Sequence, residues 1–247
     1  MVDKDFGFII NRWNFRESSV MATIYTKKFG KINGIFKGFY TRKKEFTSTL
    51  DICTLNEFVL YPKISQIWLI SYADLIKDYS FLRDNFYKSI VASIFIRVIN
   101  KGTLFFDSNE NVFWLLDRSL DSLSNNDEKR VLYIFLIKFL TISGIKPEIN
   151  LCIDCHSPYG EKFFFSTVSG GLFCEKCSKR KSSLYPISIE TSSTISYIQR
   201  EDFPLVLRIN PTPGCENEII FVLEEFLRYH LNIVPFSPLV DKLCLIG

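Results

Sequence analysis

Short alternating runs of apolar residues fill the first eighty positions of the chain. In one of them Ile32 and Phe36 fall on one face and Lys37 falls on the other, as the two-residue period of a strand requires. Turn-forming residues such as Gly30 and Pro62 separate the runs, which lie at 6–13, 20–25, 31–39, 54–60 and 67–75. Five short strands without a helical period predict a small closed β-barrel, for which the OB-fold is the leading candidate.

The apolar spacing changes after Phe81. From there apolar residues recur at three- and four-residue intervals, which predicts helices over 81–100, 112–123, 127–143, 188–199 and 216–232. Asn126 or Asp127 can cap the third of these helices, and Gly144 can end it. The sequence therefore predicts an α+β chain with an OB-fold domain over 1–80 and a helical domain over 81–247.

Two cysteine pairs interrupt the helical region. Cys152 and Cys155 form one C-x2-C motif, and Cys174 and Cys177 form a second one after an eighteen-residue gap. Each pair can bind a metal ion from one tight turn, and four thiolates complete the tetrahedron of a closed, structural zinc site. The motif predicts one Zn²⁺ in a zinc knuckle inserted at 151–178, with no open coordination position for catalysis.

Two other chemistries share part of this motif. Cys152 to His156 reads C-x-x-C-H, the attachment pattern of c-type haem, and a single C-x-x-C occurs in thioredoxin-like redox proteins. A second cysteine pair is surplus to haem attachment, which also needs an exported, oxidising setting. The redox motif belongs to a βαβ context, whereas a predicted helix precedes this one and Gly170-Gly171 follows it. Zinc is therefore favoured over both.

Composition indicates a soluble globular protein, since 47% of the residues are hydrophobic and 23% are charged. The longest apolar run, 131–145, contains Lys138 and is too short to span a bilayer. The first residues lack the layout of a signal peptide. We expect a cytoplasmic protein without a membrane partner, in which the cysteines stay reduced and the lone Cys53, Cys215 and Cys244 are small buried residues.

Positive charge is concentrated at the start of the chain. The net charge is +3, yet residues 1–50 contain ten Lys or Arg and only four Asp or Glu, an excess that is typical of a segment that binds a polyanion. Aromatic residues accompany the cations, as in single-strand binders, although a basic strand face can also be merely solvated and protect a sheet edge. The predicted DNA contacts are Lys27, Lys28, Lys31, Lys37, Arg42, Lys43 and Lys44, with Arg12 and Arg16 as weaker candidates.

Sequence motifs for catalysis are missing. The chain has no phosphate-binding G-x4-G-K-[ST] motif, no strand-linked G-x-G-x-x-G and no H-E-x-x-H. His230 lies on the edge of an apolar helix face without an activating partner, so a packing role is expected. We therefore predict a protein that is not an enzyme.

Taken together, the motifs resemble the bacterial RecO family of recombination and repair proteins almost from end to end. The matching segments include Arg16–Ser19, Tyr25–Lys31, Lys37-Gly38, Gly144–Pro147, Phe165-Ser166, Gly170-Gly171, the cysteine quartet and Phe226–Leu231. His156 departs from the pattern, because a glycine commonly follows the second cysteine.

The resemblance implies a mediator of the RecF pathway of homologous recombination. Such a protein binds single- and double-stranded DNA, anneals complementary strands, and works with RecR to load RecA onto strands coated by the single-strand-binding protein SSB. It contacts the acidic, apolar C-terminal tail of SSB. The expected place is between the 81–100 helix and the C-terminal segment, where Arg97 and Lys101 could supply charge. The implied location is cytoplasmic and nucleoid-associated. The alternative is a zinc-ribbon adaptor that binds only proteins.

Overall fold

The computed structural model describes residues 2–42, 44–61, 66–158, 162–234 and 236. The chain folds as two compact units, Met1–Asp121 and Ser122–Gly247, and each unit is described by itself.

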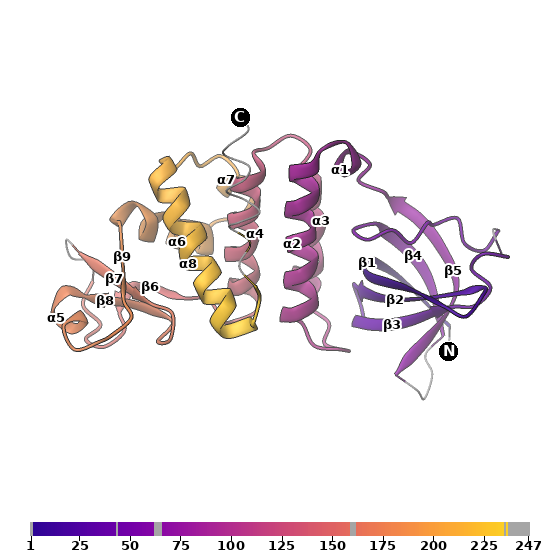
Figure 1. Ribbon diagram of the computed structural model, residues 1–247, viewed down its shortest axis with the longest axis horizontal. Helices are drawn as coiled ribbons and strands as arrows, with labels where there is room; N and C mark the ends of the chain where they lie inside the picture. Colours follow the sequence, from indigo (N-terminus) through magenta and orange to yellow (C-terminus); the bar gives the residue numbers. More distant parts are fainter. Residues whose placement is uncertain (1, 43, 62–65, 159–161, 235, 237–247) are drawn as a thin grey trace. The chain divides into compact units, whose positions relative to one another are not determined.

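A closed five-stranded barrel forms the first part of the first unit (Figure 1). The strand order is β1-β2-β3-β5-β4, and β1 closes the barrel by pairing with both β2 and β4. All neighbouring pairs are antiparallel except β3 with β5. The strands are β1 Asp3–Phe15, β2 Ser19–Thr26, β3 Gly30–Phe36, β4 Leu55–Tyr61 and β5 Ile67–Lys77. All five strands predicted from the alternation are confirmed, and their order is that of a Greek-key barrel.

One hydrophobic core fills the barrel. Ile24, Phe36 and Phe58 are fully buried in it, and the rings of Phe36 and Phe58 lie 6.0 Å apart. Phe46, from the segment between β3 and β4, adds a third ring 5.8 Å from Phe36. The core therefore explains the apolar positions of the alternating pattern.

Three helices complete the first unit: α1 Phe81–Asp84, α2 Phe86–Gly102 and α3 Glu110–Ser122. The single helix expected over 81–100 is wrong in one respect, because the backbone at Asn85 is extended, with φ −131° and ψ 105°. The Asn85 side chain accepts a hydrogen bond from the Lys88 N–H, so this residue caps α2 instead of continuing α1.

A polar network ties the end of β5 to α3. Lys77 Nζ lies 2.8 Å from both Asp117 Oδ1 and Asp121 Oδ2, and Tyr79 donates its hydroxyl to Asp117 Oδ1 at 2.8 Å. Burial alone would lower the pKa of Lys77, but the two carboxylates outweigh it and hold this pKa above its ordinary value. The network satisfies the buried carboxylate of Asp117.

The second unit contains helices and a small sheet. Its helices are α4 Glu128–Ile142, α5 Glu175–Ser178, α6 Ile189–Arg200, α7 Phe203–Val206 and α8 Pro213–Leu231. Asp127 caps α4, as predicted, and Ser188 caps α6. The last helix begins earlier than expected, because Thr212 caps it and Pro213 occupies its first turn, where proline needs no hydrogen-bond partner.

A four-stranded sheet, with order β6-β8-β7-β9, is inserted between α4 and α6. This sheet and α5 together are called the ribbon. Its strands, which the apolar pattern did not predict, are β6 Glu148–Cys152, β7 Phe163–Ser166, β8 Gly171–Cys174 and β9 Tyr185–Ile187.

The predicted fold class is confirmed: an α+β chain with an N-terminal barrel, helices and a four-cysteine insertion. Contacts group α1–α3 with the barrel, and the expected domain boundary after residue 80 stays a prediction. Among the described helices, none combines the length and apolar character needed to cross a membrane.

Candidate metal centre and nucleic-acid interface

Four cysteine sulfurs gather in the ribbon. The Sγ atoms of Cys152, Cys155, Cys174 and Cys177 all lie within 4.8 Å of one another, and those of Cys155 and Cys174 are 3.7 Å apart. In a tetrahedral zinc site with Zn–S bonds of about 2.3 Å, neighbouring sulfurs are about 3.8 Å apart. The cluster therefore has the size that one tetrahedral metal ion requires.

Strand pairing brings the two cysteine pairs together. Cys152 ends β6 and Cys174 ends β8, and these two strands pair in parallel. His156 follows the first pair with φ 55°, in the left-handed region that favours glycine, and donates its N–H to the Cys152 carbonyl at 2.8 Å. The histidine that departs from the family pattern therefore keeps the turn that a glycine would form there.

The Gly-Gly pair has a steric reason. Gly170 has φ 70°, and a Cβ atom on Gly171 would lie only 2.7 Å from the carbonyl oxygen of Glu148 on β6. A side chain at either position would disturb the turn or separate β8 from β6, and with it Cys174 from Cys152.

Hydrogen-bond donors favour the thiolate form of Cys152 and Cys155, and the thiolate is the form that binds metal. The contact with the Cys174 thiol instead raises the pKa of Cys177 to about 12. Burial raises the pKa of Cys152, but backbone N–H groups, first that of Cys155, outweigh it and hold the pKa below its ordinary value. A hydrogen bond from Ser157 lowers the pKa of Cys155. Because all four sulfurs face one another, the geometry fits a shared metal ion better than thioether bonds to haem.

Lysines lie beside the sulfur cluster. A hollow of 470 Å³ is lined by three of the cysteines together with Lys162 and Lys176. A Zn²⁺ ion with four thiolates carries a net charge of −2, so the two ammonium groups offset the charge of the predicted centre.

The cations predicted to contact DNA lie at two ends of the barrel. The turn 16–18 and the segment 37–46 share one end, called the loop end, where Tyr40 donates its hydroxyl to Asn14 Oδ1 at 2.7 Å. Lys27 and Lys28 lie at the opposite end of β2, where Lys27 donates its N–H to Phe6. The exposed cations of the loop end are Arg16, Lys37, Arg42 and Lys44; the predicted Lys43 lies outside the described residues.

Aromatic side chains lie among the cations of the loop end. Tyr40 is 44% exposed and Trp13 is 38% exposed, which makes both available for stacking. The neighbouring Phe39 packs against Phe46 and anchors the segment to the core, with ring centroids 5.6 Å apart. The loop end thus combines anchored backbone, exposed rings and exposed cations.

Arg12 contacts residues of the segment between β3 and β4. Its Nη1 atom donates to the Thr49 carbonyl at 2.7 Å and lies 3.6 Å from Asp51, and its guanidinium lies over the ring of Phe39 at 5.6 Å. Arg12 therefore holds the segment between β3 and β4 in place.

Lys31 is a buried residue with a structural role. Only 5% exposed, it donates from Nζ to the carbonyls of Asn100 and Thr103, both at 2.6 Å, and so satisfies the C-terminal end of α2. Burial, with Lys101 nearby, lowers the pKa of Lys31. The alternation separated Lys31 from the core face, but it could not reveal that α2 covers the other face.

Lys27 and Lys28 also have partners. Lys27 Nζ lies 2.6 Å from Glu110 Oε1 and 4.9 Å from the ring centroid of Trp114, while Lys28 Nζ donates to the carbonyl of Lys4 at 2.7 Å. The structure therefore does not bring the predicted cations into one site, and it leaves those of the loop end the most accessible.

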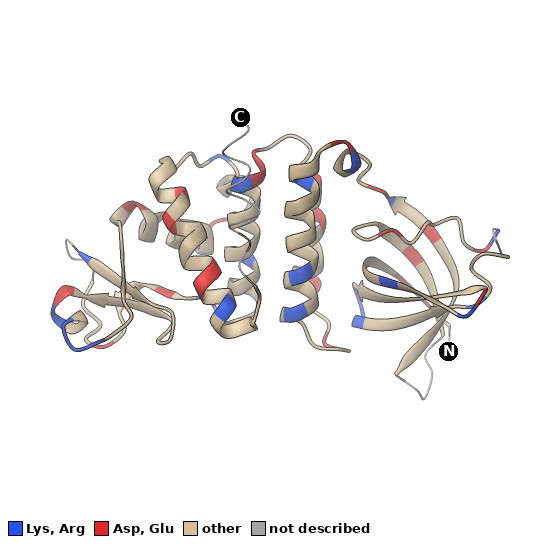
Figure 2. Ribbon diagram, in the orientation of Figure 1, with Lys and Arg blue, Asp and Glu red and all other residues tan. Residues whose placement is uncertain are grey.

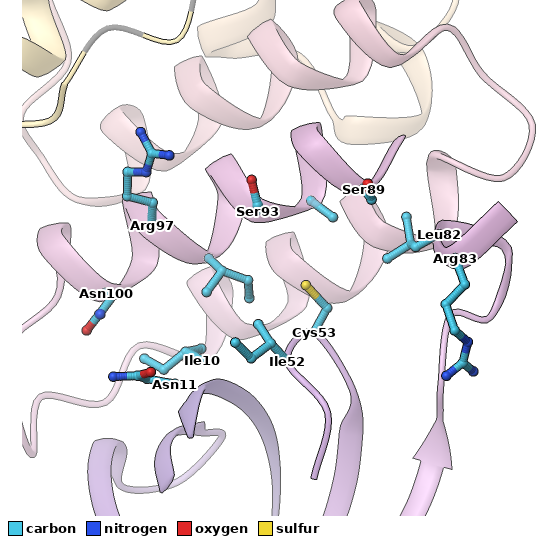
Figure 3. Close-up of a pocket in the computed structure, with 12 residues that line it drawn as sticks. Ile10, Asn11, Ile52, Cys53, Leu82, Arg83, Ser89, Ser93, Arg97 and Asn100 are labelled. Atoms are coloured by element: carbon cyan, nitrogen blue, oxygen red, sulfur yellow. The ribbon is translucent and has the colours of Figure 1, made fainter. Parts of the chain in front are cut away.

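A pocket of 720 Å³ lies in the first unit between α2 and the barrel (Figure 3). Ile10, Ile52 and Ile96 give it an apolar lining, and burial raises the pKa of the Cys53 thiol within it to about 12. Arg97 also lines the pocket and makes no hydrogen bond or ion pair with a described residue. Sequence reasoning named Arg97 but missed the pocket itself, because its residues come from segments that are far apart in the chain.

The chain thus combines a small Greek-key barrel and helices with a ribbon whose four thiolates suit a closed metal site. Comparison with known families agrees, because the model described as "Recombination protein O N terminal" matches residues 1–79 and that described as "Recombination protein O C terminal" matches residues 83–237. The chain belongs to the recombination protein O family.

Individual relatives cover nearly the whole chain. DNA repair protein RecO of Alkaliphilus metalliredigens is 25% identical over 241 residues, covering 97% of this chain and 98% of the relative. DNA repair protein RecO of Caldicellulosiruptor bescii is 29% identical over 234 residues, covering 93% of each chain.

Proposed function

We propose that this chain is a non-enzymatic mediator of DNA repair and recombination in the RecF pathway, cytoplasmic and associated with the nucleoid. It binds single- and double-stranded DNA at the loop end of the barrel and anneals complementary strands. The observation that carries this proposal is the group of exposed cations Arg16, Lys37, Arg42 and Lys44 beside the exposed rings of Trp13 and Tyr40. Family membership and the relatives' names support it.

The chemistry of the loop end suits annealing. Cations neutralise the repulsion between two phosphate backbones, and each phosphate contact releases counterions. Exposed rings can stack on bases of any sequence. Because the cations contact only phosphates, the bases stay free to pair with a second strand. Lys43 is proposed as a further contact on the basis of its sequence position.

The test is the salt dependence of single-strand affinity. Replacing Lys37, Arg42 and Lys44 together by alanine should reduce the slope of log affinity against log salt by about 2, at ~0.7 per lost contact. A matched control removes three exposed cations from the second unit, Lys146, Arg200 and Arg208. Annealing of bare complementary strands without nucleotide should slow with the same triple change. An unchanged slope and rate would favour the adaptor alternative.

Zinc is proposed as a structural cofactor held by Cys152, Cys155, Cys174 and Cys177. The size of the sulfur cluster and its hydrogen-bond donors support this assignment. When bound, the ion supplies a four-way crosslink between β6, β8 and α5, and it has no free position for a substrate. Its proposed role is therefore to fold the ribbon.

The acidic, apolar tail of SSB is proposed as a ligand of the pocket between α2 and the barrel. An apolar lining suits the tip of the tail, and the unpaired Arg97 can bind a carboxylate. Arg97→Ala should weaken the binding of a fluorescent tail peptide about tenfold, the loss expected for a charge-assisted hydrogen bond. Arg118→Ala, which removes an exposed cation of α3, is the control. Equal affinity of both variants would contradict this placement.

RecR and, through it, RecA are proposed as further partners on the strength of the family. Loading of RecA onto SSB-coated strands should then require this chain and RecR together. Loading at the same rate without RecR would contradict that part of the proposal.

A further inference from the structure

The helix motif Phe226–Leu231 is only partly explained by packing. Phe226 and Leu227 are buried, the ring of Phe226 lies 6.4 Å from that of Phe165 on β7, and His230 Nε2 lies 3.1 Å from the Thr167 carbonyl. These contacts hold the ribbon against α8. Arg228 and Tyr229, from the same motif, instead project into solvent, and Tyr229 is 57% exposed.

These two exposed residues line a pocket of 470 Å³ with Thr167, Ser183 and Tyr185. Thr167 is only 7% exposed, and its hydroxyl oxygen has no hydrogen-bond partner. A buried hydroxyl without a partner costs free energy that a ligand with a matching polar group would recover. Thr167 therefore brings an unused hydrogen-bonding group to the wall of a pocket that also has exposed aromatic surface.

A cationic segment leads into this pocket. Lys179 and Arg180 are exposed, and their side chains make no hydrogen bond or ion pair with a described residue. Only one residue separates Lys181 from the pocket residue Ser183, and Lys181 Nζ lies 3.3 Å from Asp154 Oδ2 and over the ring of Phe173. The blue segments after α5 in Figure 2 belong to this stretch. Like residues 42–44, this stretch has three adjacent cations in the sequence.

We propose that Lys179, Arg180 and the pocket beside α8 form a second site for single-stranded nucleic acid, in which the cations bind phosphates and the pocket takes one unpaired base. Stacking on Tyr229 and a hydrogen bond with the Thr167 hydroxyl hold the base. Cations beside aromatic rings are the pattern by which single strands are bound. A nucleotide also fits better than an acidic peptide, because the pocket's own arginine, Arg228, is already paired with Glu225 at 2.5 Å.

This inference rests on the proposed DNA-binding function and extends it. A chain with two separate strand sites can hold one strand at the loop end of the barrel and a second strand on the second unit. Annealing would then begin from two strands bound to one molecule.

Photocrosslinking of the full-length chain to a single strand that contains 5-iododeoxyuridine locates the bases. Adducts on Tyr229 or Tyr185 are expected, in addition to adducts in the barrel. Tyr229→Phe should keep the adduct on α8, because phenylalanine also stacks, and Tyr229→Leu should lose it.

Thr167→Val separates binding from folding. Since the hydroxyl has no partner in the protein, removing it should leave the thermal midpoint unchanged or raised, yet lower the yield of α8 adducts about fivefold through the lost hydrogen bond. Thr194→Val is a control, since Thr194 accepts only a weak contact from Cys215 and lies outside the pocket.

Charge is tested in the background of the loop-end triple variant, where the remaining binding reports the second site. Adding Lys179→Ala and Arg180→Ala should lower the salt slope by a further ~1.4, at ~0.7 per contact, and the double variant of Lys146 and Arg208 should not. Adducts confined to residues 1–121, with unchanged affinity of the second-site variants, would overturn this inference and leave the barrel function standing. If no variant changes the salt slope or the adducts, both the second site and the barrel site are overturned.

Discussion

The barrel and the ribbon are both small β-structures, but they are stabilised by different means. The barrel has strands of seven to thirteen residues, closes on itself and encloses a core of fully buried side chains such as Phe36 and Phe58. The ribbon has strands of three to five residues in an open sheet, whose buried rings are those of Phe163, Phe165 and Phe173. Short open sheets bury too little apolar surface to be stable alone. We therefore expect the ribbon, unlike the barrel, to depend on metal binding by its four cysteines.

The largest effect should follow the loss of the metal ligands. Cys152→Ser removes a fully buried ligand, and because binding of a structural zinc is coupled to local folding, the ribbon should lose its ordered sheet. Hydrogen exchange measured by mass spectrometry should show the amides of β6–β8 losing protection while those of β1–β5 keep theirs. Zinc content should fall from one ion per chain to none.

A chelator should reproduce this pattern in the unchanged chain. Ser157→Ala is the matched control, because it removes a hydroxyl near Cys155 without removing a ligand. If the ribbon amides stay fully protected from hydrogen exchange after complete removal of metal, the sheet is stable by itself. The ribbon and the barrel would then not differ in what stabilises them.

The next effect tests the barrel. Phe58→Ala should destabilise the first unit by about 3–5 kcal/mol, because a fully buried ring leaves a cavity among Phe36 and its neighbours. Urea denaturation followed by tryptophan fluorescence measures the change, since two of the tryptophans, Trp13 and Trp68, are in the barrel. Zinc content should stay at one ion per chain. A simultaneous loss of zinc would mean that the ribbon does depend on the barrel core.

A smaller effect is expected from the network at the end of β5. Tyr79→Phe removes the donor to Asp117 Oδ1 and should cost about 1.5–3 kcal/mol, the usual range for a hydrogen bond to a charged group. Thermal unfolding would show the change. Tyr72→Phe is the control, because Tyr72 is a half-buried tyrosine of β5 itself. Equal midpoints of the two variants would show that the Asp117 carboxylate finds another donor.

The smallest effect concerns the two kinds of cysteine. Burial raises the pKa of Cys53 to about 12, so at pH 8 roughly one thiol in ten thousand is a thiolate. Iodoacetamide should label Cys53 slowly both with and without metal, and should label the exposed Cys155 quickly once metal is removed. Mass spectrometry after timed labelling separates the two. Rapid labelling of Cys53 in the folded chain would show that the pocket between α2 and the barrel opens readily.

Sequence alone predicted the parts of this fold that have a local cause. The five barrel strands follow from two-residue alternation, and α4 follows from its spacing and its cap at Asp127. The cysteine quartet was predicted because the spacing of two C-x2-C pairs along the chain is enough to indicate one four-sulfur metal site. The ribbon strands were not, because β7 is the run Phe163–Ser166, without alternation, and β9 has only three residues.

The binding surfaces were predicted less well, because they depend on what covers each side chain. Lys31 and Lys37 fall on the same face of the alternating pattern, yet α2 covers Lys31 and leaves Lys37 exposed. The cations at 179–181 carry the same signal as those at 42–44, but the charge balance of the whole chain drew attention only to the N-terminal segment. The free hydroxyl of Thr167 has no signal in the sequence at all.

The double pairing of β1 has a consequence for synthesis of the chain on the ribosome. This strand is synthesised well before one of its two partners, β4, which pairs Leu60 with Asp3 and Leu55 with Phe8. At roughly 5–20 residues per second, the wait for those partners lasts about 3–10 s. During that time β1, β2 and then β3 can form only an open sheet, whose β1 edge offers unpaired N–H and C=O groups to other strands. Slow translation of residues 27–61 would therefore lengthen the period in which a nascent chain can pair with a neighbour on the same messenger.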